Sequence, residues 1–281
     1  MIGVGFNWFE SILYGLISGI SDILPVSAQA HKLVFQKMFG VNNEPELMAL
    51  CIHVAVFAAL YLSCSPMILK IMRALRLARI PKKRRKRPLD TKSLMDFRLL
   101  RTILIPIILA FFAYEKASSL QNRLIVVACI VFVNGLILYM PQYFPGSNKD
   151  SRLLSRVEGF LMGIGGAMSV IPGISGMGAA LSIGSICGVE RGYCLSIAML
   201  MNMVILIGRI AFGLIGIFSG GVGMLSAFAL LNYILAAVAA FCGTMLGVRI
   251  MRHLSAEGGF TVFAYYCWGV ALFTFILNLL A

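Results

Sequence analysis

Three side chains near the start of the chain have the types and spacing that acid–base or phosphoryl-transfer chemistry requires. Asp22, Ser27 and His31 lie within ten residues of one another, in the stretch SDILPVSAQAH. A carboxylate, a hydroxyl and an imidazole at this spacing can supply a base, a nucleophile and an acid. The structural alternative is that Asp22 caps a short helix or pairs with a nearby cation.

A second polar interruption, SVIPGISGMG, places Ser175 among three glycines, Gly173, Gly176 and Gly178. Glycine lets backbone N–H groups approach an anion, and the N-terminus of a helix adds a favourable potential. The same glycines would also permit close helix packing. If the two interruptions meet, they form a site for an anionic group at membrane depth, and a lipid phosphate is the natural candidate.

The elements that must position these residues are membrane helices. Hydrophobic residues make up 60% of the 281 residues and charged residues only 12%, whereas an ordinary soluble domain carries about 25% charged residues. This composition excludes soluble, disordered and disulfide-scaffold classes and predicts an all-α polytopic membrane protein. The runs long enough to cross a bilayer are 46–65, 99–116, 122–140, 193–218, 222–247 and 260–280.

Two further apolar stretches, 8–40 and 157–188, contain the polar interruptions described above. Each flank is too short to cross a membrane, so we expect each stretch to form a re-entrant pair of short helices. Three crossing candidates follow each stretch, which indicates a repeat. The two stretches also match at an offset of 148 residues, in the pairs Glu10/Glu158, Leu13/Leu161, Gly15/Gly163, Ser21/Ser169, Ile23/Ile171 and Ser27/Ser175.

The distribution of basic residues predicts the orientation. Of the 24 Lys and Arg residues, 13 lie between Lys70 and Arg101, which is typical of a cytoplasmic loop rather than of a nucleic-acid-binding surface. With the loop 66–98 in the cytoplasm, the chain turns outside near Ser118–Ser119, and the loop 141–156 is cytoplasmic as well.

This orientation predicts one membrane domain, 1–281, built from two inverted halves, 1–140 and 157–281. Each half would contain a re-entrant helix pair followed by three transmembrane helices. Inverted repeats with broken helices at the midplane are a common transporter design, although several membrane enzymes could share it.

The other ionisable residues that we assign to membrane-depth stretches are Glu10, His53 and Glu158. We expect the two glutamates to lie at the membrane interface, whereas His53 either faces a cavity or is a satisfied buried histidine. The seven cysteines are interpreted as small hydrophobic residues. The chain has no ATP-binding or metal-ligand motif, so no cofactor is certain.

With these features in place, two motifs can be compared with a known family. The stretch from Ser18 to His31, SGISDILPVSAQAH, resembles the motif EGLTEFLPVSSTGH of the bacterial undecaprenyl-diphosphate phosphatases. The stretch from Val170 to Arg191 is similar to that family's second motif, PGFSRSGATI followed by a GVxR turn, and CIHVAVFAALY around His53 resembles its LHLGTLLAVL segment.

The resemblance covers most of the chain and implies two inverted repeats with re-entrant helices and a polyprenyl-phosphate site. It implies a location in the bacterial cytoplasmic membrane, where the family dephosphorylates undecaprenyl diphosphate on the outer face and so recycles the cell-wall carrier lipid.

The sequence departs from these motifs at the residues that would carry the reaction. Ser18 and Asp22 replace the two glutamates of the first motif, and Ala28 replaces the second serine, which is often held to be the nucleophile. Gln29 follows where the family has threonine, while His31 is retained.

In the second motif, Gly176 replaces the arginine that would neutralise the diphosphate. Removing such a charge clamp commonly costs orders of magnitude in rate. These departures favour a non-catalytic relative that binds undecaprenyl phosphate and moves it across the membrane.

The alternative is an active undecaprenyl-diphosphate phosphatase with altered residues, which could use a divalent cation. This alternative would gain support if Lys32 or Arg191 reached the site. A third hypothesis is a lipid-binding regulatory partner without turnover. A homodimer is compatible with all three, and the partners expected are the membrane and the lipid, without nucleic acid.

The two interruptions therefore supply the candidate site. We expect Asp22 to be protonated, paired with His31 or bound to a coupling cation, because a bare carboxylate would repel a phosphate. The expected lipid-phosphate-binding residues are Ser18, Ser27, Gln29, His31, Gly173, Ser175, Gly176 and Gly178; in an active enzyme Asp22, Ser27 and His31 would be catalytic, and no metal site is predicted.

Overall fold

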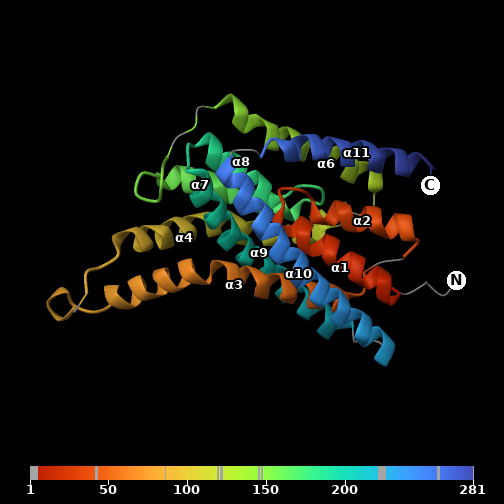
Figure 1. Cartoon of the computed structure of the whole chain (residues 1–281), viewed down its shortest axis with the longest axis horizontal. Helices are drawn as coiled ribbons and strands as arrows, with labels where there is room; N and C mark the ends of the chain where they lie inside the picture. Colours follow the sequence, from red (N-terminus) through yellow and green to blue (C-terminus); the bar gives the residue numbers. More distant parts are fainter. Residues whose placement is uncertain are drawn as a thin grey trace.

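The computed structural model of the chain is α-helical (Figure 1). It describes residues 6–41, 44–85, 87–118, 120, 123–144, 146, 148–220, 226–257 and 260–280. The α-helices are α1 (Trp8–Ile23), α2 (Ala28–Phe39), α3 (Glu46–Ala78), α4 (Thr91–Phe111), α5 (Tyr114–Ser118), α6 (Leu124–Tyr139), α7 (Arg156–Ala167), α8 (Gly176–Ile186), α9 (Arg191–Gly220), α10 (Ala227–Glu257) and α11 (Val262–Leu280). The 3-10 turns among the described residues include η1 (Lys82–Arg84), η3 (Met140–Tyr143) and η4 (Met168–Val170).

Five of these helices are long and apolar enough to cross a membrane, namely α3, α6 with η3, α9, α10 and α11. They correspond to five of the six predicted runs, and the polytopic all-α class is confirmed. The run 99–116 is the exception, because α4 begins earlier, at Thr91, and ends at Phe111. Arg98 and Arg101 lie within α4 and lower its hydropathy. The predicted turn at Ser118–Ser119 includes Ser119, which lies outside the described residues.

Both predicted interruptions are real breaks between short helices. α1 ends at Ile23, and α2 starts at Ala28 after the turn that contains Pro25. α7 ends at Ala167, η4 continues to Val170, and α8 starts at Gly176. Serine starts both returning helices, because the Oγ of Ser27 accepts the N–H of Ala30 and the Oγ of Ser175 accepts the N–H of Gly178. Such N-caps satisfy backbone groups that a helix start leaves unpaired.

The first helix of each short pair also begins in the same way. Asn7 and Glu10 form a capping box at the start of α1, and Ser155 and Glu158 form one at the start of α7. In each case the glutamate carboxylate accepts the N–H of the capping residue. The matched pair Glu10/Glu158 therefore has a structural role in helix initiation.

Close helix pairs hold the two breaks in the middle of the molecule. α1 packs on α10 and α7 packs on α4, while α3 lies against α9 and α6 against α11 (Figure 1). Glycine permits the first two approaches, because a Cβ on Gly15 would collide with the backbone of Ala236 and a Cβ on Gly163 with the backbone of Ile103. The matched pair Gly15/Gly163 thus makes the same kind of contact twice.

Candidate functional site

The two helix breaks meet at a small pocket. Ser27 and Ser175, which start α2 and α8, line it together with Gly176, and Asp22 lines it from the end of α1. The volume is about 20 Å³, enough for roughly one water molecule rather than for a phosphate. Its polar lining is completed by Ser21, Gln29, Ser169, Asn202 and Arg209.

Asn134 on α6 joins the two breaks directly. Its Oδ1 accepts the backbone N–H of Ser175 at 2.9 Å, and its Nδ2 donates to the carbonyl of Pro25 at 3.3 Å. The Asn134 side chain is fully buried. Gly178 also lets the two breaks approach closely, because a Cβ there would lie 2.9 Å from the Cβ of Pro25. The convergence of the two interruptions is therefore built into the packing.

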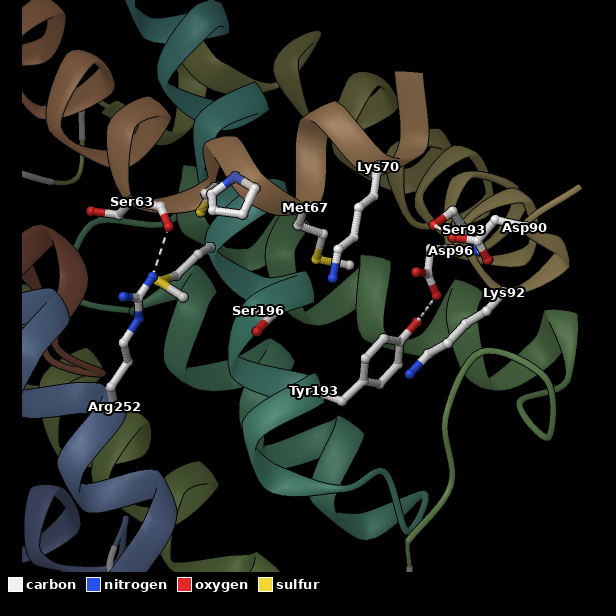
Figure 2. Close-up of a pocket in the computed structure, with 13 residues that line it drawn as sticks. Ser63, Met67, Lys70, Asp90, Lys92, Ser93, Asp96, Tyr193, Ser196 and Arg252 are labelled. Carbon is white, nitrogen blue, oxygen red and sulfur yellow. Dashed lines mark hydrogen bonds between the residues drawn. The ribbon is translucent and has the colours of Figure 1, made fainter. Parts of the chain in front are cut away.

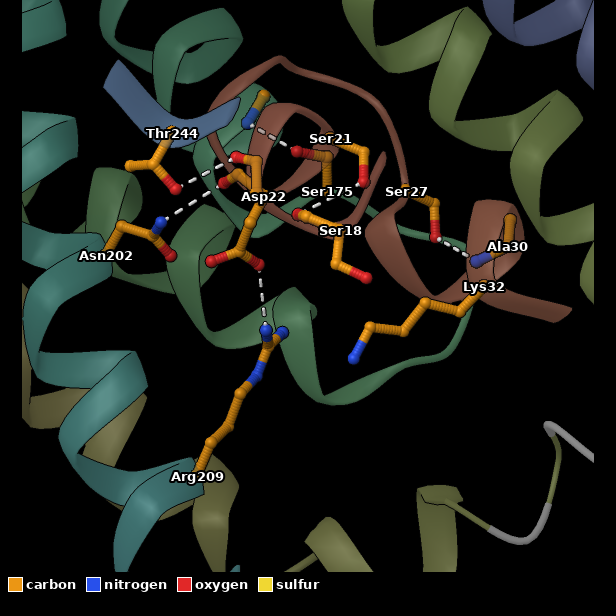
Figure 3. A network of polar contacts seen from close by, with 12 residues as sticks. Ser18, Ser21, Asp22, Ser27, Ala30, Lys32, Ser175, Asn202, Arg209 and Thr244 are labelled. Atoms are coloured by element: carbon orange, nitrogen blue, oxygen red, sulfur yellow. Dashed lines mark hydrogen bonds and ion pairs between the residues drawn. The ribbon is translucent and has the colours of Figure 1, made fainter. Parts of the chain in front are cut away.

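Asp22 forms an ion pair with Arg209, which extends from α9 (Figure 3). The Arg209 Nη1 lies 3.0 Å from the Asp22 Oδ1, and both side chains are largely buried. The expected pairing of Asp22 with His31 is therefore wrong. The structural alternative, pairing with a nearby cation, holds because an arginine from another helix reaches the carboxylate.

A larger cavity of about 480 Å³ lies beside this pocket, between α1, α2, α3 and α9. Asp22, Gln29 and Arg209 line both spaces. Two buried polar atoms, the Oγ of Ser18 and the Oδ2 of Asp22, have no hydrogen-bond partner in the structure. Ser18 and Asp22 both line the larger cavity.

Lys32 and His53 also line the larger cavity. The Lys32 side chain extends toward the Asp22–Arg209 pair (Figure 3), and its Nζ lies 3.0 Å from a carboxylate oxygen of Glu44. Of the two basic residues named from the sequence, Lys32 therefore reaches the site, whereas Arg191 lines a different cavity. His53 was expected either to face a cavity or to be a satisfied buried histidine, and the structure places it in the cavity lining.

His31 does not line either space of this site. One ring nitrogen, Nδ1, lies 2.7 Å from the carbonyl of Ser27, and the other, Nε2, lies 2.7 Å from the hydroxyl of Tyr266 on α11. The two rings also stack. The predicted grouping of His31 with Asp22 thus fails, because both ring nitrogens are engaged between α2 and α11.

The glycines have different roles from one another. Gly173 adopts a φ of +107° and packs against Ile130 of α6, so a left-handed turn requires glycine there. Gly178 is a packing contact, as described above. Gly176 alone lines the pocket, and a Cβ there would lie 2.5 Å from the Cβ of Ser169 and 2.7 Å from the carbonyl oxygen of Gly166. The sequence predicted that Gly173, Gly176 and Gly178 would all face the phosphate site, but of these three only Gly176 lines the pocket.

Sequence reasoning missed Arg209. A signal was present, because Arg209 is the only charged residue in the apolar run 193–218, and a charge at membrane depth is costly unless it is paired or functional. Its partner Asp22 had been singled out, but nothing in the spacing relates a residue of α1 to one in α9.

Comparison with known proteins gives a consistent picture. Residues 11–273 match the family model described as bacitracin resistance protein BacA. A protein of Methanobrevibacter smithii named undecaprenyl-diphosphatase is 25% identical over 95% of this chain and 96% of its own length. A protein of the same name from Halothermothrix orenii is 24% identical over 96% of this chain and 97% of its own length. Another, from Bacteroides fragilis, is 25% identical over 97% of this chain and 98% of its own length.

Proposed function

This chain belongs to the bacitracin resistance protein BacA family, and from that membership we propose that it hydrolyses undecaprenyl diphosphate to undecaprenyl phosphate. The relatives carry the name of this activity across nearly their full lengths. A location in the bacterial cytoplasmic membrane is part of the same proposal. From the sequence alone we had favoured transport of undecaprenyl phosphate over hydrolysis of undecaprenyl diphosphate. The proposal made here reverses that order.

The observation that carries the proposal is the position of Arg209. Its guanidinium lines the same small pocket as Gly176, the position at which the family arginine is missing. A guanidinium binds phosphate oxygens through two parallel N–H groups and stays charged at all working pH values. Arg209 therefore supplies, from α9, the kind of charge that the sequence had lost from the start of α8.

The remaining residues take complementary parts in this proposal. The diphosphate binds where the small pocket joins the larger cavity, with Lys32 as a second cation and the apolar walls holding the first isoprenoid units. Ser27 is the proposed nucleophile, because it lies at the N-terminus of α2, where the helix potential favours a developing oxyanion. Its Oγ forms a bond to the terminal phosphorus as the P–O–P bond breaks, and the hydroxyl proton passes to the oxygen of the leaving polyprenyl phosphate. Water then hydrolyses the phosphoserine and releases inorganic phosphate.

Two residues act without touching the phosphate. His31 holds the carbonyl of Ser27 and so positions the start of α2. Asp22 holds the Arg209 guanidinium in place and would share it with the bound diphosphate. Both are positioning residues in this proposal rather than catalytic ones.

Phosphate release by the purified full chain from undecaprenyl diphosphate, with and without a divalent cation, tests the proposal. We expect turnover in the wild type, a loss of at least about 100-fold in Arg209→Met, as for other charge clamps, and a comparable loss in Ser27→Ala. Arg249→Met is the matched control, because Arg249 is exposed and lines none of the cavities described. An inactive wild type, or an Arg209→Met variant of full activity, would contradict it.

Movement of undecaprenyl phosphate across the membrane remains a second proposal. It is supported by the equivalent contacts of α1 on α10 and of α7 on α4, which suit a pair of inverted halves around a central site. Protein-dependent exchange of labelled undecaprenyl phosphate between the leaflets of a proteoliposome tests it. Exchange no faster than in empty liposomes would exclude this function.

A further inference from the structure

A separate cavity lies between the C-terminal half of α3 and the N-terminal half of α9. The larger cavity of the proposed active site is lined by α3 residues from Glu46 to Val56, whereas this cavity is lined by α3 residues from Ser63 to Lys70. Its volume is about 360 Å³, and it opens near the segment that leads into the basic loop. α4, the start of α9 and the end of α10 complete its walls (Figure 2).

Three cations from three helices line this cavity, namely Lys70 of α3, Lys92 of α4 and Arg252 of α10. Arg252 donates one hydrogen bond, from Nη2 to the carbonyl of Ser63. Lys92 lies over the Tyr193 ring, and its Nζ is 3.9 Å from a carboxylate oxygen of Asp150. Within the described part of the chain, no hydrogen bond or ion pair is recorded for Lys70. Much of the donor capacity of these cations is thus directed to no protein group.

The two carboxylates in the lining already have donors. Both oxygens of Asp90 accept hydrogen bonds from Ser93, one from its N–H and one from its hydroxyl. Asp96 accepts hydrogen bonds from the hydroxyls of Tyr193, at 2.9 Å, and Ser151. Hydrogen bonds from neutral donors leave both carboxylates charged, and neither forms an ion pair with a cation of the cavity among the described residues. The three cations of the lining therefore exceed its two carboxylates by one positive charge.

The rest of the lining is apolar. Cys64, Pro66 and Met67 of α3 and Met199 of α9 lie beside the polar groups. Methionine side chains adapt to irregular apolar ligands. The combination of cations with a deformable apolar wall suits a ligand that has an anionic head and a hydrocarbon chain.

We propose that this cavity is a phosphate-binding site separate from the proposed active site, and that it takes a phosphomonoester head group. Lys70, Lys92 and Arg252 bind the phosphate oxygens, and the wall formed by Pro66, Met67 and Met199 contacts the start of the chain. A lipid phosphate and free inorganic phosphate share this chemistry. The inference does not depend on whether the chain hydrolyses undecaprenyl diphosphate.

Protection of a cysteine inside the cavity gives a local test. Ser196 lines the cavity near its centre (Figure 2), so Ser196→Cys is introduced into the full chain after its seven cysteines have been replaced. The rate of maleimide labelling is measured with farnesyl phosphate, inorganic phosphate or farnesol. We expect farnesyl phosphate to slow labelling and farnesol, which lacks the charge, to leave it unchanged.

Charge-removing variants then identify the binding groups. Lys70→Met and Arg252→Met should each raise the half-protecting concentration at least tenfold, whereas Arg73→Met and Arg249→Met, exposed positions on the same two helices, should not change it. Lys70→Met keeps the test valid if loss of the Arg252 bond to Ser63 disturbs folding, since the Lys70 ammonium makes no hydrogen bond or ion pair with another described residue.

The probes also separate the two sources of phosphate. Protection by farnesyl phosphate alone supports a lipid head group, and equal protection by inorganic phosphate supports a site for the free ion. Equal protection by farnesol, or protection that persists unchanged in Lys70→Met and Arg252→Met, would overturn the proposal.

Discussion

At the scale of single residues, the Asp22–Arg209 pair joins two elements that are far apart in sequence. A buried ion pair contributes little net stability, because desolvation of the two charges offsets most of their attraction. Removing one partner is costly, however, because the other charge stays buried alone. One Asp22 oxygen already lacks a partner, so Arg209 is its main source of compensation.

The first prediction follows from this asymmetry. Arg209→Met should destabilise the protein by roughly 3–5 kcal/mol, the usual cost of breaking a buried pair, whereas adding Asp22→Asn should recover part of the loss. Chemical unfolding in one detergent, followed by circular dichroism, measures both. If the double variant is less stable than Arg209→Met, the isolated Asp22 charge is not the cause of the loss.

The second prediction concerns Gly176. Restoring the family arginine by Gly176→Arg should not raise phosphate release and should destabilise the protein by about 1–3 kcal/mol, as overpacking does, because its Cβ would collide with Ser169 and the Gly166 carbonyl. Groups that act together are not additive, so the combination with Ser18→Glu and Ala28→Ser is measured as well. A more active Gly176→Arg single variant would show that Arg209 does not fill the missing role.

At the scale of elements, short helices need an external link to hold their broken ends together. The Asn134 amide supplies it by bonding to both breaks. An asparagine on α10, Asn232, makes a comparable buried bond to the carbonyl of Phe6, away from the breaks. The two residues therefore form a matched pair for separating stability from activity.

The third prediction uses this pair. Asn134→Ala and Asn232→Ala should each cost about 1–3 kcal/mol, because each leaves a buried backbone group unsatisfied. Only Asn134→Ala should also lower phosphate release at a temperature where both variants are folded. Equal activity in the two variants would indicate that the link between the breaks does not position the site.

At the scale of the whole molecule, the matched sequence pairs take matched structural roles. Glu10 and Glu158 complete capping boxes, Gly15 and Gly163 allow close helix approach, and Ser27 and Ser175 start the returning helices. These shared roles support the proposal of two inverted halves. Re-entrance from opposite faces and the membrane depth of the breaks remain predictions.

The fourth prediction tests the orientation. On a background without cysteine, Lys83→Cys and Asn148→Cys should react with a membrane-impermeant maleimide only after the membrane is opened, because the positive-inside rule places both loops in the cytoplasm. Lys116→Cys should react from outside. Labelling of Lys83→Cys in intact cells would overturn the orientation of the whole chain.

The class of fold, the two helix breaks and most of the long apolar helices could be predicted from the amino-acid sequence. These features depend on local composition, because apolar runs must be helical in a bilayer and Pro, Gly and Ser interrupt them wherever they fall. The sequence also identified Asp22, Ser27 and Ser175, since polar residues stand out in an apolar stretch, and it identified Ser18 through the resemblance to the family motif.

The sequence did not predict which of these residues lie against one another, because that depends on how the helices pack. In the structure, His31 contacts Tyr266, Asp22 forms an ion pair with an arginine of α9, and Lys32 lines the larger cavity. Such choices depend on the packing of helices that are separated by more than a hundred residues, and spacing along the chain carries no information on that distance. Arg209 of α9 lies in the pocket that Gly176 lines, and no motif comparison at Gly176 could reveal this.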